Sequence, residues 1–280
     1  MGSSMITSNL SDFLQYLCRE ERSAGTREKY LRDIHAFAVW LGEKEVTKQN
    51  VLDWKAHLQQ ENYAPATINS MLAAVNAFFR FMHWDECRVK ALRIQRRAFR
   101  DTARELTKQE YDLLVRTARG LGNERLALVM ETICATGIRV SEVKYITAEA
   151  VRCGRVEISL KGKIRTILLP GKLCRKLRKY AEKQKIASGE IFLTRSGASL
   201  SRRQIWAEMK RLCRRAGVAP SKVFPHNLRH LFAMVFYRAS RDIAKLADVL
   251  GHSSIETTRI YLMTTGTEHV RLMEQLHLVS

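Results

Sequence analysis

The feature that most constrains this chain is a break in its hydrophobic periodicity between Cys87 and Arg104. Before the break, apolar residues recur at helical spacing, and after it helical and alternating patterns are mixed. The break itself holds seven basic residues and a single acidic one. They are Arg88, Lys90, Arg93, Arg96, Arg97, Arg100 and Arg104, against Asp101. We therefore expect two domains, over 1–86 and 105–280, joined by a basic linker over 87–104.

The first domain is predicted to be a bundle of four helices. In its first helix the apolar residues are Leu10, Phe13, Leu14 and Leu17. Its second helix carries a similar stripe, with Thr26 expected as the N-cap. Two further helices are expected at about 47–60 and 66–82. Four helices of this length suffice for one small domain.

The second domain mixes helices with a small sheet. "TKQE" at 107–110 is typical of a capping box, and a later helix over about 124–135 is expected to stop at Gly137. Residues 156–170 alternate about a Lys-Gly-Lys turn, which predicts a β-hairpin with lysines at its tip. A short strand is expected at 191–194, and a basic helix after Ser201. The fold class is thus mainly α with a small antiparallel sheet (α+β).

The net positive charge of the chain comes from the part after residue 86. Residues 1–86 carry a net formal charge of −2, whereas the remainder carries +22. Such an imbalance favours a polyanion as partner, because neutralised phosphates release counterions; a solubilising surface is the alternative. The candidate contacts lie in the linker and on the helix after Ser201. They are Arg93, Arg96, Arg97, Arg100, Arg202, Arg203 and Lys210.

Cysteine spacing and hydropathy argue against a metal site, a disulfide framework and a membrane-spanning segment. The six cysteines are far apart, with no CxxC pair, and we expect them to be reduced core residues. No apolar run approaches the ~18 residues of a membrane span. The N-terminus does not resemble a signal peptide. We expect a cytoplasmic protein without metal, cofactor or membrane partner.

Several polar residues stand out against the apolar segments around them. Arg139 follows the Thr136–Gly137 break, where an ion pair with Glu142 would explain it on its own. His226, Arg229 and His230 fall on one face of a helix that Pro225 can start. A single histidine there would usually be a core residue, but the cluster favours a site.

A second group of polar residues follows the next helix. That helix should end at Leu250 and turn through Gly251, which presents His252, and Tyr261 comes nine residues later. No pair of carboxylates accompanies these groups, which argues against a two-metal nuclease. Guanidinium forks can bind phosphate oxygens, and the other groups can move protons. The inventory suits attack on a phosphodiester without a metal.

These motifs, in this order, closely resemble the tyrosine recombinases of the phage-integrase family. The resemblance rests on "TGIRVSE", the lysine hairpin, "HNLRH", "LGHSS" and "TTRIY". It extends over nearly the whole chain, with 6–83 similar to the family's SAM-like core-binding domain and 105–280 similar to its catalytic domain. It implies a site-specific recombinase that integrates, excises or resolves double-stranded DNA at specific core sites, without ATP or metal.

The resemblance also implies the roles of the phosphate clamp and the nucleophile. Arg139 and Arg229 would bind the scissile phosphate. Tyr261 would attack it, leaving a 3′-phosphotyrosyl link and a free 5′-hydroxyl.

Three further residues take proton-transfer or hydrogen-bonding roles by the same resemblance. His226 would assist proton transfer with Tyr261, and His252 would bind the pentavalent phosphate. A hairpin lysine would protonate the departing 5′-oxygen. We assign Lys161, although "SLKGKIR" departs from the family's G-K-G-x-K-x-R pattern and leaves Lys163 as an alternative. His230 is expected to support the structure.

The resemblance further implies an assembly. Val270, Leu272, Met273 and Leu276 form an apolar stripe near the C-terminus. In related enzymes such a terminal helix docks on the neighbouring subunit of a cyclic tetramer, and docking on its own domain is the alternative. We expect no additional arm-binding domain before the first bundle, which suggests simple core sites.

Three other functions compete with recombination. A helix-turn-helix regulator is suggested by the spacing of Ala247 and Gly251, but it leaves the arginines and histidines unexplained. A zinc hydrolase would use His226, His230 and His252, but position 227 is Asn where a zinc protease needs Glu. A relaxing topoisomerase of type IB shares the tyrosine chemistry, and the helical first domain favours recombination over it.

Overall fold

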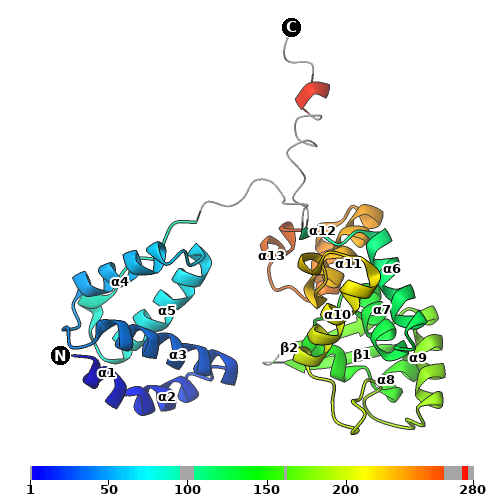
Figure 1. Ribbon diagram of the computed structural model, residues 1–280, viewed down its shortest axis with the longest axis horizontal. Coiled ribbons are helices and arrows are strands. Elements are labelled where there is room, and N and C mark those ends of the chain that lie inside the picture. The colour runs from blue at the N-terminus through cyan, green and yellow to red at the C-terminus, as the bar shows by residue number, and fades with distance from the viewer. Residues whose placement is uncertain (1, 95–103, 161–162, 262–272, 277–280) are drawn as a thin grey trace. The chain divides into compact units, whose positions relative to one another are not determined.

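The computed structural model describes residues 2–94, 104–160, 163–261 and 273–276 (Figure 1). The chain divides into two compact units, Met1–Arg96 and Arg97–Ser280. Within the described residues, no helix is both long and apolar enough to span a bilayer.

The first unit is a helical bundle around an aromatic core. Its α-helices are α1 (Ser3–Ser8), α2 (Leu10–Arg19), α3 (Ala24–Leu41), α4 (Lys48–Gln60) and α5 (Pro65–Phe81). Helices α2 to α5 are the four that were expected, and α1 adds the buried Ile6 to their core. The predicted Thr26 cap is wrong. Ser23 caps α3 instead, because its hydroxyl accepts a hydrogen bond from the backbone N–H of Thr26 inside the first turn.

The first residues of the basic stretch follow a 3₁₀ turn over Asp85–Cys87 and are hydrogen-bonded to side chains of α5. The side chain of Asn76 bonds to the backbone N–H and C=O of Val89, at 3.1 and 2.8 Å. The side chain of Asn69 does the same for Leu92, at 2.7 and 2.9 Å. These two amides pair backbone groups that have no partner in a helix or strand. The segment up to Leu92 is therefore part of the first unit's surface, and Arg93 beyond it is exposed.

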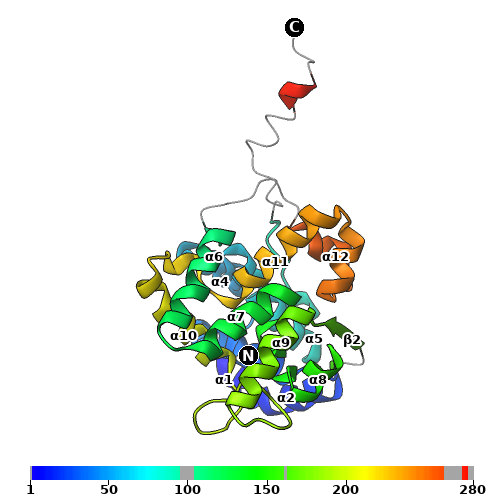
Figure 2. The same cartoon turned by 90° about the vertical axis from the view of Figure 1, so that its right-hand side faces the viewer.

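The second unit is built around α7 (Glu124–Thr136), whose side chains are mostly buried. Its neighbours are α6 (Lys108–Gly120), α9 (Gly171–Lys183), α10 (Arg202–Ala216) and α11 (Pro225–Ser240), as Figure 2 shows. Two short helices follow α11, namely α12 (Ile243–Leu250) and α13 (Ile255–Arg259). The remaining elements are α8 (Ala148–Cys153) and the 3₁₀ segments Val140–Tyr145 and Pro220–Lys222. The capping boxes at Thr107 and Ser201 form as their sequences indicate.

The described residues of the second unit contain one sheet, a hairpin of β1 (Arg155–Leu160) and β2 (Lys163–Leu168). The strands are antiparallel, and Ile158 lies opposite Arg165. The mainly α fold with a small antiparallel sheet is therefore confirmed. The strand expected at 191–194 is wrong, because only an isolated bridge joins Leu193 to Ser199. Both Ile191 and Phe192 are buried, so this short run has no alternating exposed side.

Candidate active site

The site begins where α7 ends. Gly137 takes the left-handed conformation (φ +65°) that closes the helix, and the chain then enters a 3₁₀ turn with Arg139 at its start. A Cβ at position 137 would lie 2.5 Å from the ring of Phe232. Glycine is thus required twice, by its backbone conformation and by the close approach of α11. The break after Thr136 places Arg139 beside α11.

Arg139 is held by Glu142 and remains half-exposed. Its Nη1 lies 2.9 Å from the Glu142 carboxylate, and its backbone N–H donates to the same carboxylate at 2.7 Å. Its Nη2 donates to the carbonyl of Gly251 at 3.4 Å. The Arg139 side chain is 44% exposed, whereas that of Glu142 is 1% exposed. The ion pair expected on sequence grounds exists, and it leaves part of the guanidinium open to a ligand.

Arg229 is the buried member of the arginine pair. It lies on α11 and is 3% exposed. Its guanidinium donates to the carbonyl of Gly137 and, at 2.8 Å, to that of Leu250. Burial and the positive charge of Arg139 lower the pKa of Arg229 to about 10, while the charge of the nearby Tyr261 acts in the opposite direction. Arg229 has no carboxylate partner among the described residues, and a cation buried in this way is prepared to receive an anion.

His252 follows the αL glycine at the end of α12 and contacts Arg229 directly. Its Nε2 lies 2.9 Å from Nη2 of Arg229, and its Nδ1 lies 2.9 Å from the hydroxyl of Thr258. Burial and then the positive charge of Arg229 lower the pKa of His252 to about 4. The imidazole is therefore neutral at physiological pH.

Tyr261 lies just beyond α13 and packs between two imidazoles. Its ring stacks on that of His252 at a centroid distance of 6.1 Å and is tilted against that of His230 at 5.0 Å. The Tyr261 side chain is 3% exposed and lies close enough to Arg229 to affect its pKa. The predicted nucleophile and the buried predicted clamp thus meet within one chain. His230, expected to support the structure, packs against the tyrosine.

An open cleft of about 820 Å³ adjoins these groups. Both Arg139 and Arg229 line it, as does His226 from the first turn of α11. Burial and the positive charge of Arg229 lower the pKa of His226. An imidazole held neutral in this way is suited to accept a proton.

Two of the predicted DNA-contacting residues, Arg202 and Arg203, line the same cleft from the start of α10. The third residue predicted on α10 has a local partner. Lys210 donates to the carbonyl of Pro220, and its ammonium group lies over Trp206 at 5.3 Å. Trp206 also lines the cleft, so Lys210 supports its wall.

Five of the remaining predicted residues lie outside the described residues or in the first unit. Lys161, Arg96, Arg97 and Arg100 lie outside the described residues. Arg93 belongs to the first unit. The alternative lysine, Lys163, is the first residue of β2.

No metal centre is found among the described residues, where no group of three or more His, Cys, Asp and Glu side chains has the geometry to hold an ion. The six cysteines are free. Cys18 and Cys153 are exposed, so the expectation of six core cysteines is wrong for these two.

Arg165 was not among the residues predicted from the sequence. Its guanidinium contacts both oxygens of Glu142, at 3.0 and 3.1 Å, and donates to the carbonyl of Val249 at 2.8 Å. It lies on the same face of β2 as the buried Ile167, opposite the buried Ile158. An arginine at an inward position of an alternating strand is the signal that could have identified it.

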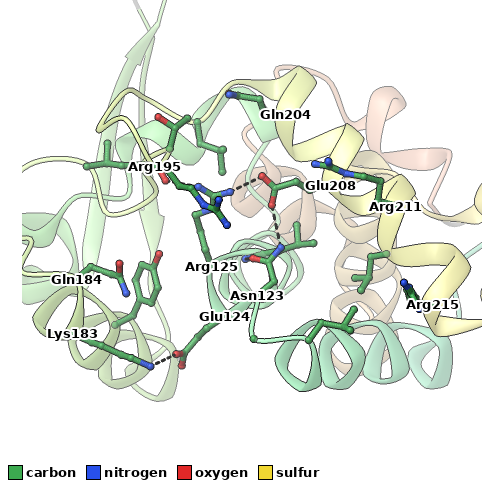
Figure 3. A pocket seen from close by; sticks show the side chains of 18 residues that line it. Asn123, Glu124, Arg125, Lys183, Gln184, Arg195, Gln204, Glu208, Arg211 and Arg215 are labelled. Carbon is green, nitrogen blue, oxygen red and sulfur yellow. Dashed lines mark hydrogen bonds and ion pairs between the residues drawn. The ribbon is translucent and has the colours of Figure 1, made fainter.

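A second cleft, of about 900 Å³, contains none of the predicted catalytic residues. Figure 3 shows it beside α10, lined by Gln204, Glu208, Arg211 and Arg215. These residues recur every three or four positions and so share one face of α10, distinct from the face of Arg202 and Trp206. At its base, Arg125 forms an ion pair with Glu208 at 2.6 Å.

Comparison with known proteins gives a consistent result. Residues 104–267 match the family model described as "Phage integrase family", and residues 10–86 match "Phage integrase, N-terminal SAM-like domain".

Among curated proteins, the chain is similar to tyrosine recombinase XerC of Roseiflexus castenholzii (strain DSM 13941 / HLO8). The two are 31% identical over 273 residues, which cover 89% of this chain and 86% of XerC.

Among solved structures, the chain is similar to the Tn1549 transposon integrase in complex with transposon right end DNA. The TM-score is 0.74 at 16% identity, and each chain is fully covered. It is also similar to a lambda integrase tetramer bound to a Holliday junction, with a TM-score of 0.73 at 18% identity. That match covers 91% of this chain and 76% of the integrase. At these identities the similarity establishes a shared fold.

Proposed function

The chain belongs to the phage integrase family and is a site-specific DNA recombinase, and we propose that Tyr261 is its nucleophile. The observation that carries this proposal is the position of the phenol. It is buried close enough to Arg229 to affect the pKa of that guanidinium, and its ring packs against two imidazoles within one chain. An anion bound by Arg229 would therefore lie beside the phenol oxygen.

The chemistry proposed for this site exchanges one ester for another. The Tyr261 oxygen attacks the scissile phosphorus, the bond from phosphorus to the 5′-oxygen breaks, and a 3′-phosphotyrosyl link forms. The phenol proton passes to His226, and a hairpin lysine, Lys161 with Lys163 as the alternative, protonates the departing 5′-oxygen. The 5′-hydroxyl of another strand then attacks the phosphotyrosine and releases Tyr261. Each step conserves a phosphodiester, so no ATP is required.

Arg139 and Arg229 are proposed to stabilise the charge that develops on the phosphorus. Arg229 is already fixed by backbone carbonyls, so it need not reorganise when the phosphate arrives. Arg139 is half-exposed and can approach a second non-bridging oxygen. His252, already bonded to Arg229, is proposed to turn its Nε2 to the same phosphate.

Basic residues of the cleft and of the linker are proposed to bind double-stranded DNA at specific core sites. Arg202 and Arg203 line the catalytic cleft and are exposed. Together with Arg93, Arg96, Arg97 and Arg100 they would neutralise backbone phosphates on either side of the cut. Cleavage would then take place in the cytoplasm, where free cysteines stay reduced.

Assembly into a tetramer on paired sites is proposed to use the C-terminal stripe. Met273 and Leu276 within it are 64% and 62% exposed. An apolar groove of about 620 Å³ between α6, α7, α9 and α11 could accept such side chains from a neighbouring copy. Val235 in this groove is 50% exposed. Two large exposed side chains and an open apolar groove are complementary surfaces for association.

Trapping of covalent DNA tests this function. The protein would be purified from its native host under denaturing conditions, and DNA that remains attached would be sequenced. We expect the wild-type chain to carry DNA from one class of site and Tyr261→Phe to carry none, with binding to that site nearly unchanged. An adduct on the Phe variant would show that the nucleophile is another residue. A wild-type chain that binds a site but never carries DNA covalently would be a regulator.

A further inference from the structure

Arg165 connects three segments that are far apart in the sequence. From β2, its Nη1 contacts the Glu142 carboxylate at 3.0 and 3.1 Å, and its Nη2 donates to the Val249 carbonyl at 2.8 Å. Glu142 holds Arg139, and Val249 lies in the last turn of α12, three residues before His252. One guanidinium thus links β2 to the segments that carry both of these predicted catalytic residues.

The contact between Arg165 and Gly251 is close enough to dictate the residue at 251. A Cβ there would lie 2.3 Å from Cδ of Arg165 and 2.5 Å from its Nε. The φ of +62° at Gly251 also favours glycine. The turn that presents His252 therefore rests directly on the Arg165 side chain. A shift of this side chain would move the turn.

The Glu142 carboxylate forms ion pairs with two arginines at once, Arg139 and Arg165. Its carboxylate is 1% exposed, so its charge has to be compensated by protein groups. Arg139 provides one partner and Arg165 the other. Removal of Arg165 would leave Arg139 as the only cation on this carboxylate, and Arg139 would be drawn more tightly to it. Its guanidinium would then be less available to a phosphate.

Arg165 itself is not placed to contact DNA. Its side chain is 12% exposed, and its two Nη groups already bond to Glu142 and Val249. Its Nε is buried without a hydrogen-bond partner among the described residues. Both charge and shape matter here, because a lysine would keep the charge but carries all its donors on one nitrogen, whereas Arg165 reaches Glu142 and Val249 with two different nitrogens.

We propose that Arg165 is a positioning residue for strand cleavage, which sets Arg139 and the His252 turn at the separation that the phosphate requires. This inference rests on the proposed function, because it assigns Arg165 a role through two residues of that site. It predicts that loss of Arg165 impairs the chemical step and leaves DNA binding intact. A misplacement of about 1 Å in such a group can cost about 100-fold in rate.

The test compares Arg165→Met, Arg165→Lys and the wild type on a nicked duplex that carries the core site recovered by covalent trapping. The matched control is Arg155→Met, because Arg155 lies on the neighbouring strand, is 63% exposed and has its ion pair with Glu157 of its own strand. Adduct formation, DNA affinity and the urea midpoint would be measured for each. We expect Arg165→Met to form adduct about 100-fold more slowly than the wild type, with a DNA affinity within about twofold of the wild-type value. The adduct rate of Arg165→Lys should be intermediate, and that of Arg155→Met should match the wild type.

A methylphosphonate at the scissile position distinguishes positioning from general damage. The methyl group replaces a charged oxygen and so removes one negative charge from the phosphate. Cleavage of this substrate therefore depends less on charge stabilisation by the Arg139 guanidinium. If Arg165 acts through Arg139, Arg165→Met should lose much less activity, relative to the wild type, on this substrate than on the ordinary phosphate. An equal loss of adduct rate on both substrates would overturn the proposal. Wild-type adduct rates for both Arg165 variants, or unfolding of both variants, would also overturn it. Failure of the wild-type chain to form any adduct would instead count against the proposed function.

Discussion

Arg229 donates a hydrogen bond to His252, and this bond determines where the imidazole carries its proton. The two nitrogens lie 2.9 Å apart. A guanidinium can only donate, so Nε2 of His252 must be the acceptor and is unprotonated. The proton is then on Nδ1, which donates to the hydroxyl of Thr258 at 2.9 Å. In the free protein, Nε2 of His252 is thus a hydrogen-bond acceptor for Arg229. The phosphate that is proposed to displace His252 from Arg229 is an acceptor as well.

This arrangement predicts a loss of stability in mild acid. The pKa of His252 is lowered from 6.5 to about 4 in the folded chain. Between these values the unfolded chain binds a proton that the folded chain does not, so the free energy of unfolding falls as the pH falls from about 6.5 to about 4. His252→Gln lacks this titration, and its stability should fall less over the same range. Urea midpoints of both chains across this range would measure the difference, and parallel profiles would contradict the prediction.

Bound DNA should raise the pKa of His252. The cause of the low value includes the positive charges of Arg229 and Arg139, and a phosphate between them would offset these charges. Protonated His252 can also donate to the phosphate through Nε2. A titration of ¹³C-labelled histidine followed by NMR, with Tyr261→Phe to prevent cleavage, should show a higher pKa with the core-site duplex than without it. An unchanged value would mean that His252 does not approach the phosphate.

The two clamp arginines should differ in their effect on stability. Arg229→Ala leaves the carbonyls of Gly137 and Leu250 without their donors in a buried site, which should lower the free energy of unfolding by about 2 to 4 kcal/mol. Arg139 is 44% exposed, so Arg139→Ala should cost less than about 1.5 kcal/mol. Both variants should lose the covalent adduct. Urea denaturation of the two chains would test this, and equal costs would refute the assignment of Arg229 as the buried anchor.

The ion pair in Figure 3 provides a stability prediction away from the phosphate site. Glu208 is 12% exposed, and Arg125→Met would leave it without its cation at a cost of about 3 kcal/mol. A double replacement, Arg125→Met with Glu208→Met, should recover at least half of that loss, because no buried charge remains. Lys183→Met at the rim of the same cleft is the control. Its 3.7 Å contact with Glu124 is exposed, so it should change stability by less than about 0.5 kcal/mol. A double variant less stable than the single one would show that the pair matters for more than its charge.

Several helix ends were predictable because the signals that set them are local, although the cap of α3 was placed at Thr26 instead of Ser23. The hydroxyls of Thr107 and Ser201 accept from residues three positions ahead, and Gly137 closes α7 by its own backbone. The strand at 191–194 was not predictable, because burial of an apolar run depends on what surrounds it. Helix α9 could have been found from the spacing of Leu173, Leu177 and Tyr180, which are all buried, and it was overlooked.

For the site, the motifs indicated which residues gather but not how they are held. Arg139, Arg229, His252 and Tyr261 come from four segments, and the structure brings them together. The sequence did not indicate that Arg229 would be buried on carbonyls while Arg139 stays half-exposed. That difference depends on the packing of α7, α11 and α12, which no short motif encodes. The role of Arg165 depends on the same tertiary contacts.

Two glycines in equivalent backbone positions should respond differently to alanine. Gly137 ends α7 and Gly217 ends α10, and both have φ of +65°. At Gly217 a Cβ meets nothing within 4 Å, so Gly217→Ala should cost only the left-handed conformation, about 1 kcal/mol. At Gly137 a Cβ would lie 2.5 Å from Phe232 and 3.0 Å from Leu250, which adds an overpacking cost of about 1 to 3 kcal/mol. Because the Gly137 carbonyl accepts from Arg229, Gly137→Ala should also slow adduct formation, whereas Gly217→Ala should not. Equal urea midpoints and equal adduct rates for the two variants would show that α11 can move away from Gly137 at no cost to the site.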